Sequence, residues 1–195
     1  MSLRPMPALL TTGILALTCG LAGCQRPPVE SQQAEAPTPI DRGEYLVATL
    51  GCDECHSPKT MTAEGPAPDM TRRLSGHLGN LSFPPPPTLP AGPWGVVTSM
   101  DLTAWSGPWG VSYATNLTPD ENTGMGIWTE DMFLKAIRTG KHMGQSRPIL
   151  PPMPWATYAK LSDEDLKAVY AFLRALPPVA NSVPDPVIAT PPPSP

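Results

Sequence analysis

The sequence predicts a mainly helical domain that is interrupted by long irregular connections. Helix signals occur in three stretches, which begin near Asp41, Thr129 and Ser162. Proline accounts for 29 of the 195 residues, about three times its ordinary share, and this limits regular structure elsewhere. The length is that expected of one domain with additional segments.

The first helix signal leads directly into a cysteine-containing motif. Asp41 and Glu44 are spaced as a capping box, and an apolar run over residues 45–50 follows. Pro58 cannot continue a helix, so we expect this one to end around His56.

The two later helices have clear boundary residues. Thr129 is placed as an N-cap, and Gly140 is placed to end the helix that follows. Ser162 and Asp165 form a second capping-box pattern, and Pro177 stops the last helix. Apolar stripes at helical spacing run along both segments.

The motif at the end of the first helix is Cys52-Asp53-Glu54-Cys55-His56. Cys-x-x-Cys-His is the attachment signature of a c-type haem. Thiols one helical turn apart can each add to a vinyl group on the same porphyrin edge. The next residue is then placed to bring its imidazole to the iron. We therefore predict one covalent haem c on Cys52 and Cys55, with His56 as an axial ligand.

A cysteine pair with this spacing is also compatible with two other functions. Cys-x-x-Cys can form a redox disulfide or half of a zinc site. A structural zinc site normally needs a second ligand pair, and the sequence has no cysteine after residue 55. A thioredoxin-like site requires an α/β pattern around the motif, and the sequence lacks one. Haem attachment is therefore favoured.

The second axial ligand has four candidates, which are Met125, His142, Met143 and Met153. Met153 is flanked by prolines that restrict the backbone, and it lies just before the last helix. A thioether binds iron weakly, so a methionine ligand must be held firmly. We predict Met153 as the ligand, with His142 as its main competitor.

Residues 57–115 carry few interpretable signals. The runs 96–98 and 111–113 are compatible with two short strands. His77 lies beside a glycine in a polar stretch, which indicates a surface or loop histidine. Three tryptophans could cover a haem edge or pack within a loop subdomain: Trp94, Trp105 and Trp109.

The first 23 residues have the pattern of an export leader. A short apolar run, too short to span a membrane comfortably, ends in a sequence that resembles the bacterial lipobox, Leu21-Ala22-Gly23-Cys24. This resemblance implies cleavage after Gly23 and lipid attachment to Cys24. The alternatives are an ordinary secretory leader or an uncleaved anchor. Gln25 after the cysteine favours the outer membrane, and either location places the domain in the periplasm.

Composition divides the rest of the chain. Residues 24–40 are rich in proline and polar residues, and we expect a flexible, lipid-anchored linker. Residues 41–178 are the expected haem domain. In residues 179–195 proline again dominates, and we expect a disordered tail.

The order of these features resembles a type I cytochrome c over residues 41–178. The resemblance implies an all-α fold, the type I cytochrome c fold, here with a long loop-rich insertion that has room for a short β-hairpin. It also implies that the first and last helices cross near the haem edge. Gly43 would allow the close approach, against Tyr170 or Leu173 on the other helix.

Two shorter stretches resemble a narrower group. Residues 116–128 and the loop Pro152-Met153-Pro154 resemble haem domains of the cytochrome c subunits of alcohol and gluconate dehydrogenases. Those subunits usually carry three haem motifs, whereas this chain carries one. This difference favours a single-haem shuttle or relay.

The predicted function is one-electron transfer, because a haem with two protein ligands has no open position for substrate. Sulfur ligation favours the ferrous state and raises the reduction potential. Expected partners are redox proteins, either a membrane dehydrogenase or a terminal oxidase or reductase. The formal charge of −4 suggests a partner with a basic or neutral surface, and the lack of a basic run argues against nucleic acid.

Other hypotheses remain open on sequence alone. A haem enzyme or gas sensor, of peroxidase or thiosulfate-oxidising type, would have an open or displaceable sixth ligand. A structural lipoprotein would use the cysteine pair only as a disulfide. Asn116, Trp128 and Arg147 could bond the haem propionates or the methionine surroundings, or could stabilise loops.

Overall fold

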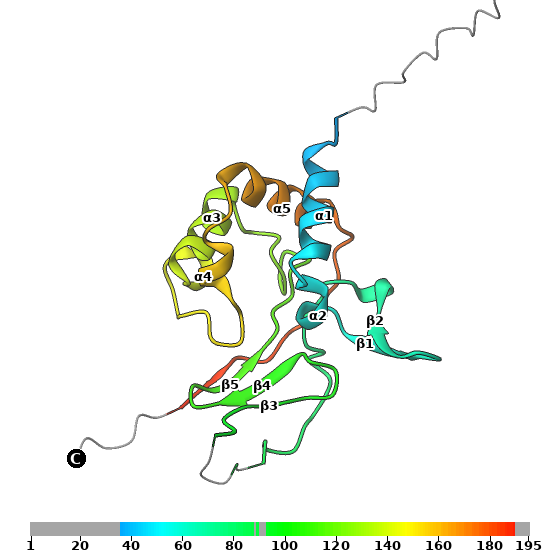
Figure 1. Ribbon diagram of the computed structural model, residues 1–195, viewed down its shortest axis with the longest axis vertical. Coiled ribbons are helices and arrows are strands. Elements are labelled where there is room, and N and C mark those ends of the chain that lie inside the picture. The colour runs from blue at the N-terminus through cyan, green and yellow to red at the C-terminus, as the bar shows by residue number, and fades with distance from the viewer. Residues whose placement is uncertain (1–35, 88, 90–92, 190–195) are drawn as a thin grey trace, which may run out of the picture. The chain divides into compact units, whose positions relative to one another are not determined.

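The computed structural model describes residues 36–87, 89 and 93–189 (Figure 1). The expected leader, Cys24 and most of the expected linker lie outside these residues. No helix in the described part of the chain is long and apolar enough to cross a membrane. The α-helices are α1 (Pro39–Thr49), α2 (Cys52–His56), α3 (Glu130–Thr139), α4 (Trp155–Tyr158) and α5 (Asp163–Ala175). The short 3-10 helices are η1 (Met70–Arg72) and η2 (His142–Gly144).

Two antiparallel sheets accompany the helices, so the prediction of an all-α fold is wrong. Strands β1 (Lys59–Thr62) and β2 (Gly65–Pro68) form a hairpin directly after α2. The second sheet has the order β3-β4-β5-β6. Its strands are β3 (Val97–Thr98), β4 (Ala104–Gly107), β5 (Gly110–Tyr113) and β6 (Val187–Ile188).

The strands expected at 96–98 and 111–113 exist as β3 and β5, but they do not pair with each other. Strand β4 lies between them, because Gly107 and Gly110 enclose a two-residue turn that returns the chain alongside itself. Gly110 has φ +106, a conformation that glycine adopts without strain. The insertion therefore contains two hairpins, β1-β2 and β4-β5, while its described residues between η1 and β3 form neither helix nor strand.

Helix α1 starts earlier than the sequence pattern suggests. Thr38 is the N-cap, and its hydroxyl accepts a hydrogen bond from the Asp41 N–H at 3.2 Å. The Asp41 carboxylate accepts in return from the Thr38 N–H at 3.0 Å. The capping box is thus Thr38–Asp41 instead of Asp41–Glu44, and Pro39 occupies the first helical turn, where its missing N–H costs nothing.

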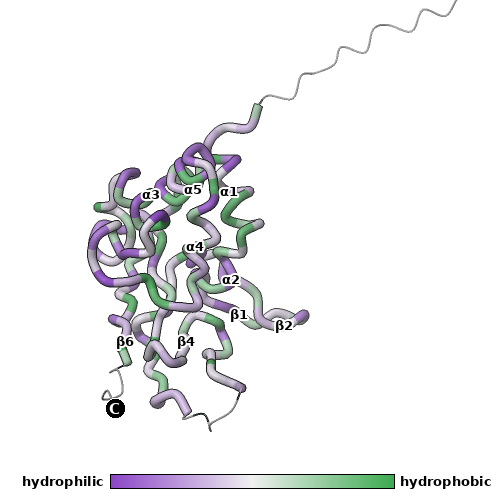
Figure 2. The backbone as a smooth tube through the Cα atoms, turned by 60° about the vertical axis from the view of Figure 1, so that its left-hand side comes forward, coloured by the Kyte–Doolittle hydropathy of each residue, from purple (hydrophilic) through white to green (hydrophobic). Residues whose placement is uncertain are grey.

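The boundaries predicted for α3 and α5 are confirmed. The Thr129 hydroxyl accepts from the Met132 N–H at 3.2 Å, and Gly140 ends α3 with φ +65. The Ser162 hydroxyl accepts from the Asp165 N–H at 3.1 Å. Along the helical part of the tube in Figure 2, apolar and polar residues alternate repeatedly, as expected for helices with one buried face.

Helices α1 and α5 cross closely, as predicted, and Gly43 makes the crossing possible. A Cβ at Gly43 would lie 2.0 Å from the Ala168 carbonyl oxygen and 2.7 Å from the Phe172 Cβ. The contacts on α5 are therefore Ala168 and Phe172, and the expected contacts Tyr170 and Leu173 are wrong. Buried side chains of α1, α3 and α5 form the main core: Leu46, Val47, Phe133, Ile137, Leu166, Val169, Phe172 and Leu173.

Residues 179–189 are packed against the domain, so the expected disordered tail does not begin at residue 179. The Asn181 side-chain amide donates to the carbonyls of Ser75 (2.7 Å) and His77 (2.8 Å), and strand β6 pairs with β5. The prolines prevent a helix here, but they do not prevent an extended segment from bonding to the existing sheet.

Candidate haem-binding site

A cavity of about 640 Å³ lies between α2, β5, α3 and the loop before α4. This volume is within the range of roughly 300–1,000 Å³ that is usual for pockets that bind small molecules and cofactors. Cys52, Cys55, His56 and Met153 all line the cavity, although Met153 lies far along the chain from the motif. Apolar side chains contribute much of the remaining wall: Leu117, Met125, Phe133, Ile137, Ile149 and Leu150.

His56 is buried and oriented as a metal ligand requires. Its Nδ1 lies 2.8 Å from the Thr115 carbonyl oxygen. A carbonyl can only accept a hydrogen bond, so Nδ1 carries the proton and Nε2 keeps its lone pair. Burial lowers the pKa of His56, which keeps the imidazole neutral at neutral pH. The donor set at this position therefore fits haem iron.

The two motif cysteines are not joined to each other by a disulfide. Burial raises the pKa of Cys52 to about 12, with a further contribution from the Asp53 carboxylate. Burial also raises the pKa of Cys55. Reactive Cys-x-x-Cys redox sites instead have a lowered thiol pKa. The surroundings of this pair therefore do not favour a redox disulfide, and its place on the cavity wall suits haem attachment.

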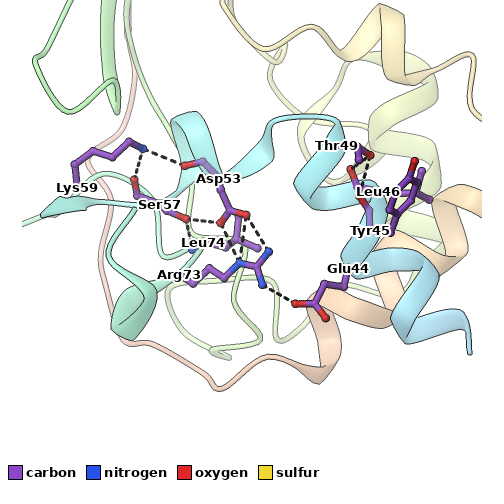
Figure 3. A network of polar contacts seen from close by, with 9 residues as sticks. All are labelled: Glu44, Tyr45, Leu46, Thr49, Asp53, Ser57, Lys59, Arg73 and Leu74. Carbon is purple, nitrogen blue, oxygen red and sulfur yellow. Dashed lines mark hydrogen bonds and ion pairs between the residues drawn. The ribbon is translucent and has the colours of Figure 1, made fainter. Parts of the chain in front are cut away.

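An ion-pair network holds the motif helix α2 to the rest of the domain (Figure 3). The Arg73 guanidinium contacts the Asp53 carboxylate at 2.9 Å and the Glu44 carboxylate of α1 at 3.0 Å. The same guanidinium lies 5.1 Å from the centre of the Phe172 ring on α5. Arg73 and Asp53 are both largely buried, so this network ties the motif to both crossing helices.

The end of α2 is capped by two further side chains, which Figure 3 also shows. Lys59 Nζ donates to the carbonyls of Asp53, Glu54 and Ser57 at 2.8–3.0 Å. These contacts satisfy carbonyls at the helix C-terminus, where a positive charge is stabilising. The Ser57 hydroxyl donates to Asp53 Oδ1 at 2.8 Å and accepts from the Leu74 N–H at 2.9 Å.

Candidates for the second ligand also line the cavity. Met153, His142 and Met125 all line the cavity, whereas Met143 is not among its lining residues. The loop of Met153 is fixed from β5, where the Ser112 hydroxyl donates to the Pro151 carbonyl at 2.6 Å. The choice of Met153 over His142 stays a prediction.

His142 already has neighbours of its own. Its ring meets the Trp128 ring edge-on, with centroids 5.0 Å apart. Its pKa is lowered by burial and by the nearby positive charge of Arg147. Trp128 and Arg147 both line the cavity, as do Asp185 and its neighbours from the C-terminal segment.

The structure distinguishes between the alternatives left open for other residues singled out in the sequence. Asn116 stabilises a loop, because its side chain bonds the Val179 carbonyl (2.8 Å) and the Thr118 N–H (3.0 Å). Trp105 lines the cavity, whereas Trp94 is 82% exposed.

The surface position expected for His77 is wrong. Its side chain is buried, with Nδ1 2.7 Å from the Thr103 hydroxyl, and that hydroxyl donates to Asp101 at 2.9 Å.

Sequence reasoning missed two groups of cavity residues. Tyr158 lines the cavity and donates from its hydroxyl to the Leu50 carbonyl at 2.7 Å. Residues 182–186 also form part of the wall. The sequence gives little indication that residues 182–186 line a cavity. Asn181 is a single polar residue in a proline-rich segment, and it carries little weight alone.

Comparison with known proteins gives relatives with named functions. The cytochrome c subunit of quinone alcohol dehydrogenase from Gluconobacter oxydans is 42% identical over 174 residues, 88% of this chain. The gluconate 2-dehydrogenase cytochrome c subunit of Pantoea cypripedii is 34% identical over 73% of the chain. The fructose dehydrogenase cytochrome subunit of Gluconobacter japonicus is 30% identical over 87% of the chain.

The chain spans only part of these relatives. The matched regions make up 29%, 24% and 28% of the Gluconobacter oxydans, Pantoea cypripedii and Gluconobacter japonicus proteins, respectively. No protein-family model matches the sequence. The similarity nevertheless extends over most of this chain.

Proposed function

Since this chain is a cytochrome c that resembles the haem-bearing cytochrome subunits of gluconate, fructose and alcohol dehydrogenases, we propose that it is a one-electron carrier in a dehydrogenase-linked respiratory chain. In this proposal one haem c is attached to Cys52 and Cys55, with His56 and Met153 as axial ligands. The redox partner is a membrane dehydrogenase or a terminal oxidase or reductase.

The observation that carries the proposal is the convergence of four residues on one cavity. The attachment motif comes from α2, and Met153 comes from a loop 97 residues later, between α3 and α5. Bound haem would supply an iron that alternates between the ferric and ferrous states. The apolar wall would exclude water, which disfavours the extra positive charge of the ferric state.

The chain's own residues prepare the site for this role. The Thr115 carbonyl fixes the His56 tautomer, and the Arg73 network fixes the helix that carries both thiols. Second-shell contacts of this kind set ligand orientation and basicity. A second ligand from the loop that carries Met153 would leave no coordination site for substrate, which favours electron transfer over catalysis at the iron.

The identity of the second ligand can be tested by spectroscopy. The purified, exported protein should give a pyridine haemochrome spectrum of covalent haem c, with one haem per chain. Met153→Ala should abolish the long-wavelength absorption band of thioether-bound ferric haem, whereas Met143→Leu should keep it. If His142→Ala changes the axial spectrum and Met153→Ala does not, the assignment of Met153 is wrong.

The enzyme or sensor alternative predicts a different result. An open or displaceable sixth position would let carbon monoxide bind tightly to the untreated ferrous protein. We expect little binding by the wild type and clear binding by Met153→Ala. Tight binding by the wild type would replace the carrier proposal with the alternative.

We also propose that the chain is an exported lipoprotein with its haem domain in the periplasm. The sequence Leu21-Ala22-Gly23-Cys24 and the need to attach haem c after export support this proposal. Cys24→Ser should move the protein from the membrane fraction to the soluble periplasmic fraction. The control Cys19→Ser should leave it in the membrane fraction, and an unchanged distribution of both variants would refute lipidation at Cys24.

A further inference from the structure

Part of the cavity wall is a continuous stretch of extended chain. All five residues from 182 to 186 line the cavity, together with Cys55, His56 and Met153. They belong to the segment 179–189, which follows α5 and ends in β6, the strand that lies beside β5 (Figure 1). We call residues 179–189 the strap, because both of its ends are held on the domain and its middle forms the wall.

The first end of the strap is bonded to the loop that precedes α3. The Val179 N–H donates to the Thr118 hydroxyl at 3.1 Å, and the Val179 carbonyl accepts from the Asn116 side chain at 2.8 Å. The Asn181 N–H donates to the Thr123 hydroxyl at 3.0 Å. Polar side chains of one loop therefore hold the start of the strap.

The Asn181 side chain adds a second set of bonds to another part of the chain. Both of its amide hydrogens are used, because the amide donates to the carbonyls of Ser75 (2.7 Å) and His77 (2.8 Å). Its oxygen accepts from the Gly79 N–H at 3.0 Å. A Cβ at Gly79 would overlap the Ser182 carbonyl oxygen, so the strap passes directly over this glycine. Asn181 thus fixes the point at which the strap enters the cavity wall.

The second end of the strap is held by the sheet. Strand β6 pairs with β5, where Val187 is the partner of Val111, and the Ala189 N–H donates to the Trp109 carbonyl at 2.9 Å. A Cβ at Gly110 would overlap the Val187 carbonyl oxygen, so this pairing also depends on a glycine. The five residues between the two held ends are the five that line the cavity.

The strap is attached to the domain without being part of its core. None of its residues belongs to the apolar core of the described chain, and Val187 and Ile188 are 59% and 58% exposed. Segments with few buried apolar contacts open locally at a lower free energy than core helices do. The strap can therefore leave the domain while α1, α3 and α5 stay packed.

We propose that the strap closes the cavity over bound haem and opens as a unit, with Asn181 as the residue that positions it. The inference rests on the proposed electron-carrier function and deepens it. A closed strap keeps water and small ligands out of the cavity, and solvent access is one of the properties through which a protein tunes a metal site. Opening removes five consecutive wall residues at once, so access changes in one step.

The first test displaces the strap with a single methyl group. Gly79→Ala places a Cβ against the Ser182 carbonyl, whereas nothing lies within 4 Å of a Cβ at Gly95, which makes Gly95→Ala the matched control. Hydrogen–deuterium exchange of the full exported protein, followed by mass spectrometry, reports the opening. In Gly79→Ala, exchange over residues 179–189 should be faster by roughly tenfold or more, with α5 unchanged. Equal exchange in the two variants, or a strap that exchanges only together with α5, would overturn the proposal.

A second pair of variants tests the positioning residue. Asn181→Ala removes the bonds to Ser75, His77 and Gly79, whereas Asn80 is an exposed asparagine of the same loop as Gly79. Asn181→Ala should speed exchange of the strap as Gly79→Ala does, and Asn80→Ala should resemble the wild type. Slow exchange of the strap in Asn181→Ala would show that Asn181 does not position it.

The last test measures access to the cavity. In the ferrous Met153→Ala protein the predicted second ligand is absent, so it does not have to leave before carbon monoxide binds. After flash photolysis, carbon monoxide should rebind from solution several-fold faster when Gly79→Ala is added than when Gly95→Ala is added. Equal rates would show that the strap is not a barrier. Tight carbon monoxide binding with Met153 intact would refute the carrier function, while the exchange difference between Gly79→Ala and Gly95→Ala would still decide whether the strap opens.

Discussion

The two walls of the cavity are held in different ways. The motif wall, residues 52–57, is fixed by charged and polar side chains. Arg73 binds the Asp53 carboxylate, Lys59 caps three carbonyls, and Ser57 links the helix to the Leu74 N–H. Most of these partners lie within about twenty residues of the motif, so the wall is organised locally.

The loop wall, residues 149–154, depends on distant parts of the fold. Three of its six residues are prolines, which restrict the backbone but donate no hydrogen bonds. Its anchors include the Ile149 N–H to the Gly140 carbonyl at 2.8 Å and the Ser112 hydroxyl to the Pro151 carbonyl at 2.6 Å. The attachment side is therefore held mainly by charged and polar side chains close to it in sequence, whereas the ligand side is positioned by β5 and α3.

Breaking the network of the motif wall should have the largest effect on stability. Arg73→Ala leaves the largely buried Asp53 carboxylate without its partner, and we expect a loss of roughly 3 kcal/mol in the free energy of unfolding. Guanidinium denaturation followed by far-UV circular dichroism measures this loss.

The neighbouring arginine offers a matched control. Arg72 pairs with Asp69 in a partly exposed ion pair, and its own side chain is 43% exposed. Arg72→Ala should cost no more than about 1 kcal/mol. Similar losses for the two variants would show that the Arg73 network does not hold the motif wall.

A pair of serine substitutions compares the two walls directly. Ser57→Ala removes the partner of the buried Leu74 N–H, at a cost of roughly 1–3 kcal/mol in unfolding free energy. Ser112→Ala frees the exposed Pro151 carbonyl, which water can solvate, and should cost about 1 kcal/mol or less.

We expect the spectral effects of the same two variants to have the reverse order of their effects on stability. Ser112→Ala loosens the loop of Met153, so it should weaken the thioether band and lower the midpoint potential, as measured by spectroelectrochemistry. Ser57→Ala should leave the band in place. If the band weakens in Ser57→Ala alone, the motif wall and not the loop wall controls ligand geometry.

Local signals in the sequence were sufficient for part of this architecture. The boundaries of α3 and α5 follow from Thr129, Gly140 and Ser162, because caps involve residues three or four positions apart. The motif residues and Met153 also line one cavity, as predicted. Each of them could be identified because its signal lies in its immediate sequence neighbours.

Long-range pairing could not be predicted in the same way. Strand β4 has no strong alternation of its own, and it is defined by pairing on both sides. The packing of residues 179–189 against the domain depends on hydrogen bonds from the Asn181 side chain to carbonyls more than 100 positions earlier. His77 appeared polar and exposed beside Gly76, yet Phe83 and Tyr113 enclose its ring at centroid distances of 5.3 and 4.9 Å.

The smallest expected effect is a pH dependence that sharpens the view of the motif wall. His77 lies behind that wall, because the adjacent Gly76 N–H donates to the His56 carbonyl at 2.7 Å. Burial lowers the pKa of His77, although the negative charge of Asp101 opposes this shift. Thr103 and Tyr113 are its other polar neighbours.

The sign of the effect follows from proton binding. Below the ordinary histidine pKa of about 6.5, the unfolded chain takes up a proton that folded His77 resists. The contribution is therefore fully present above that pH and is lost as the pH falls below it. Hydrogen bonds from Thr71 and Thr123 lower the pKa values of Asp69 and Asp120. The contributions of these two carboxylates to stability are therefore lost at more acidic pH, below about 4.

His77→Phe keeps an aromatic ring between Phe83 and Tyr113 but cannot be protonated. Between pH 7.5 and 5, we expect the free energy of unfolding of this variant to fall less steeply than that of the wild type. Only the slopes are compared, because the variant also loses the bond to Thr103 and its absolute stability will differ. Parallel slopes in denaturation series at matched ionic strength would mean that His77 is not a source of acid sensitivity behind the motif wall.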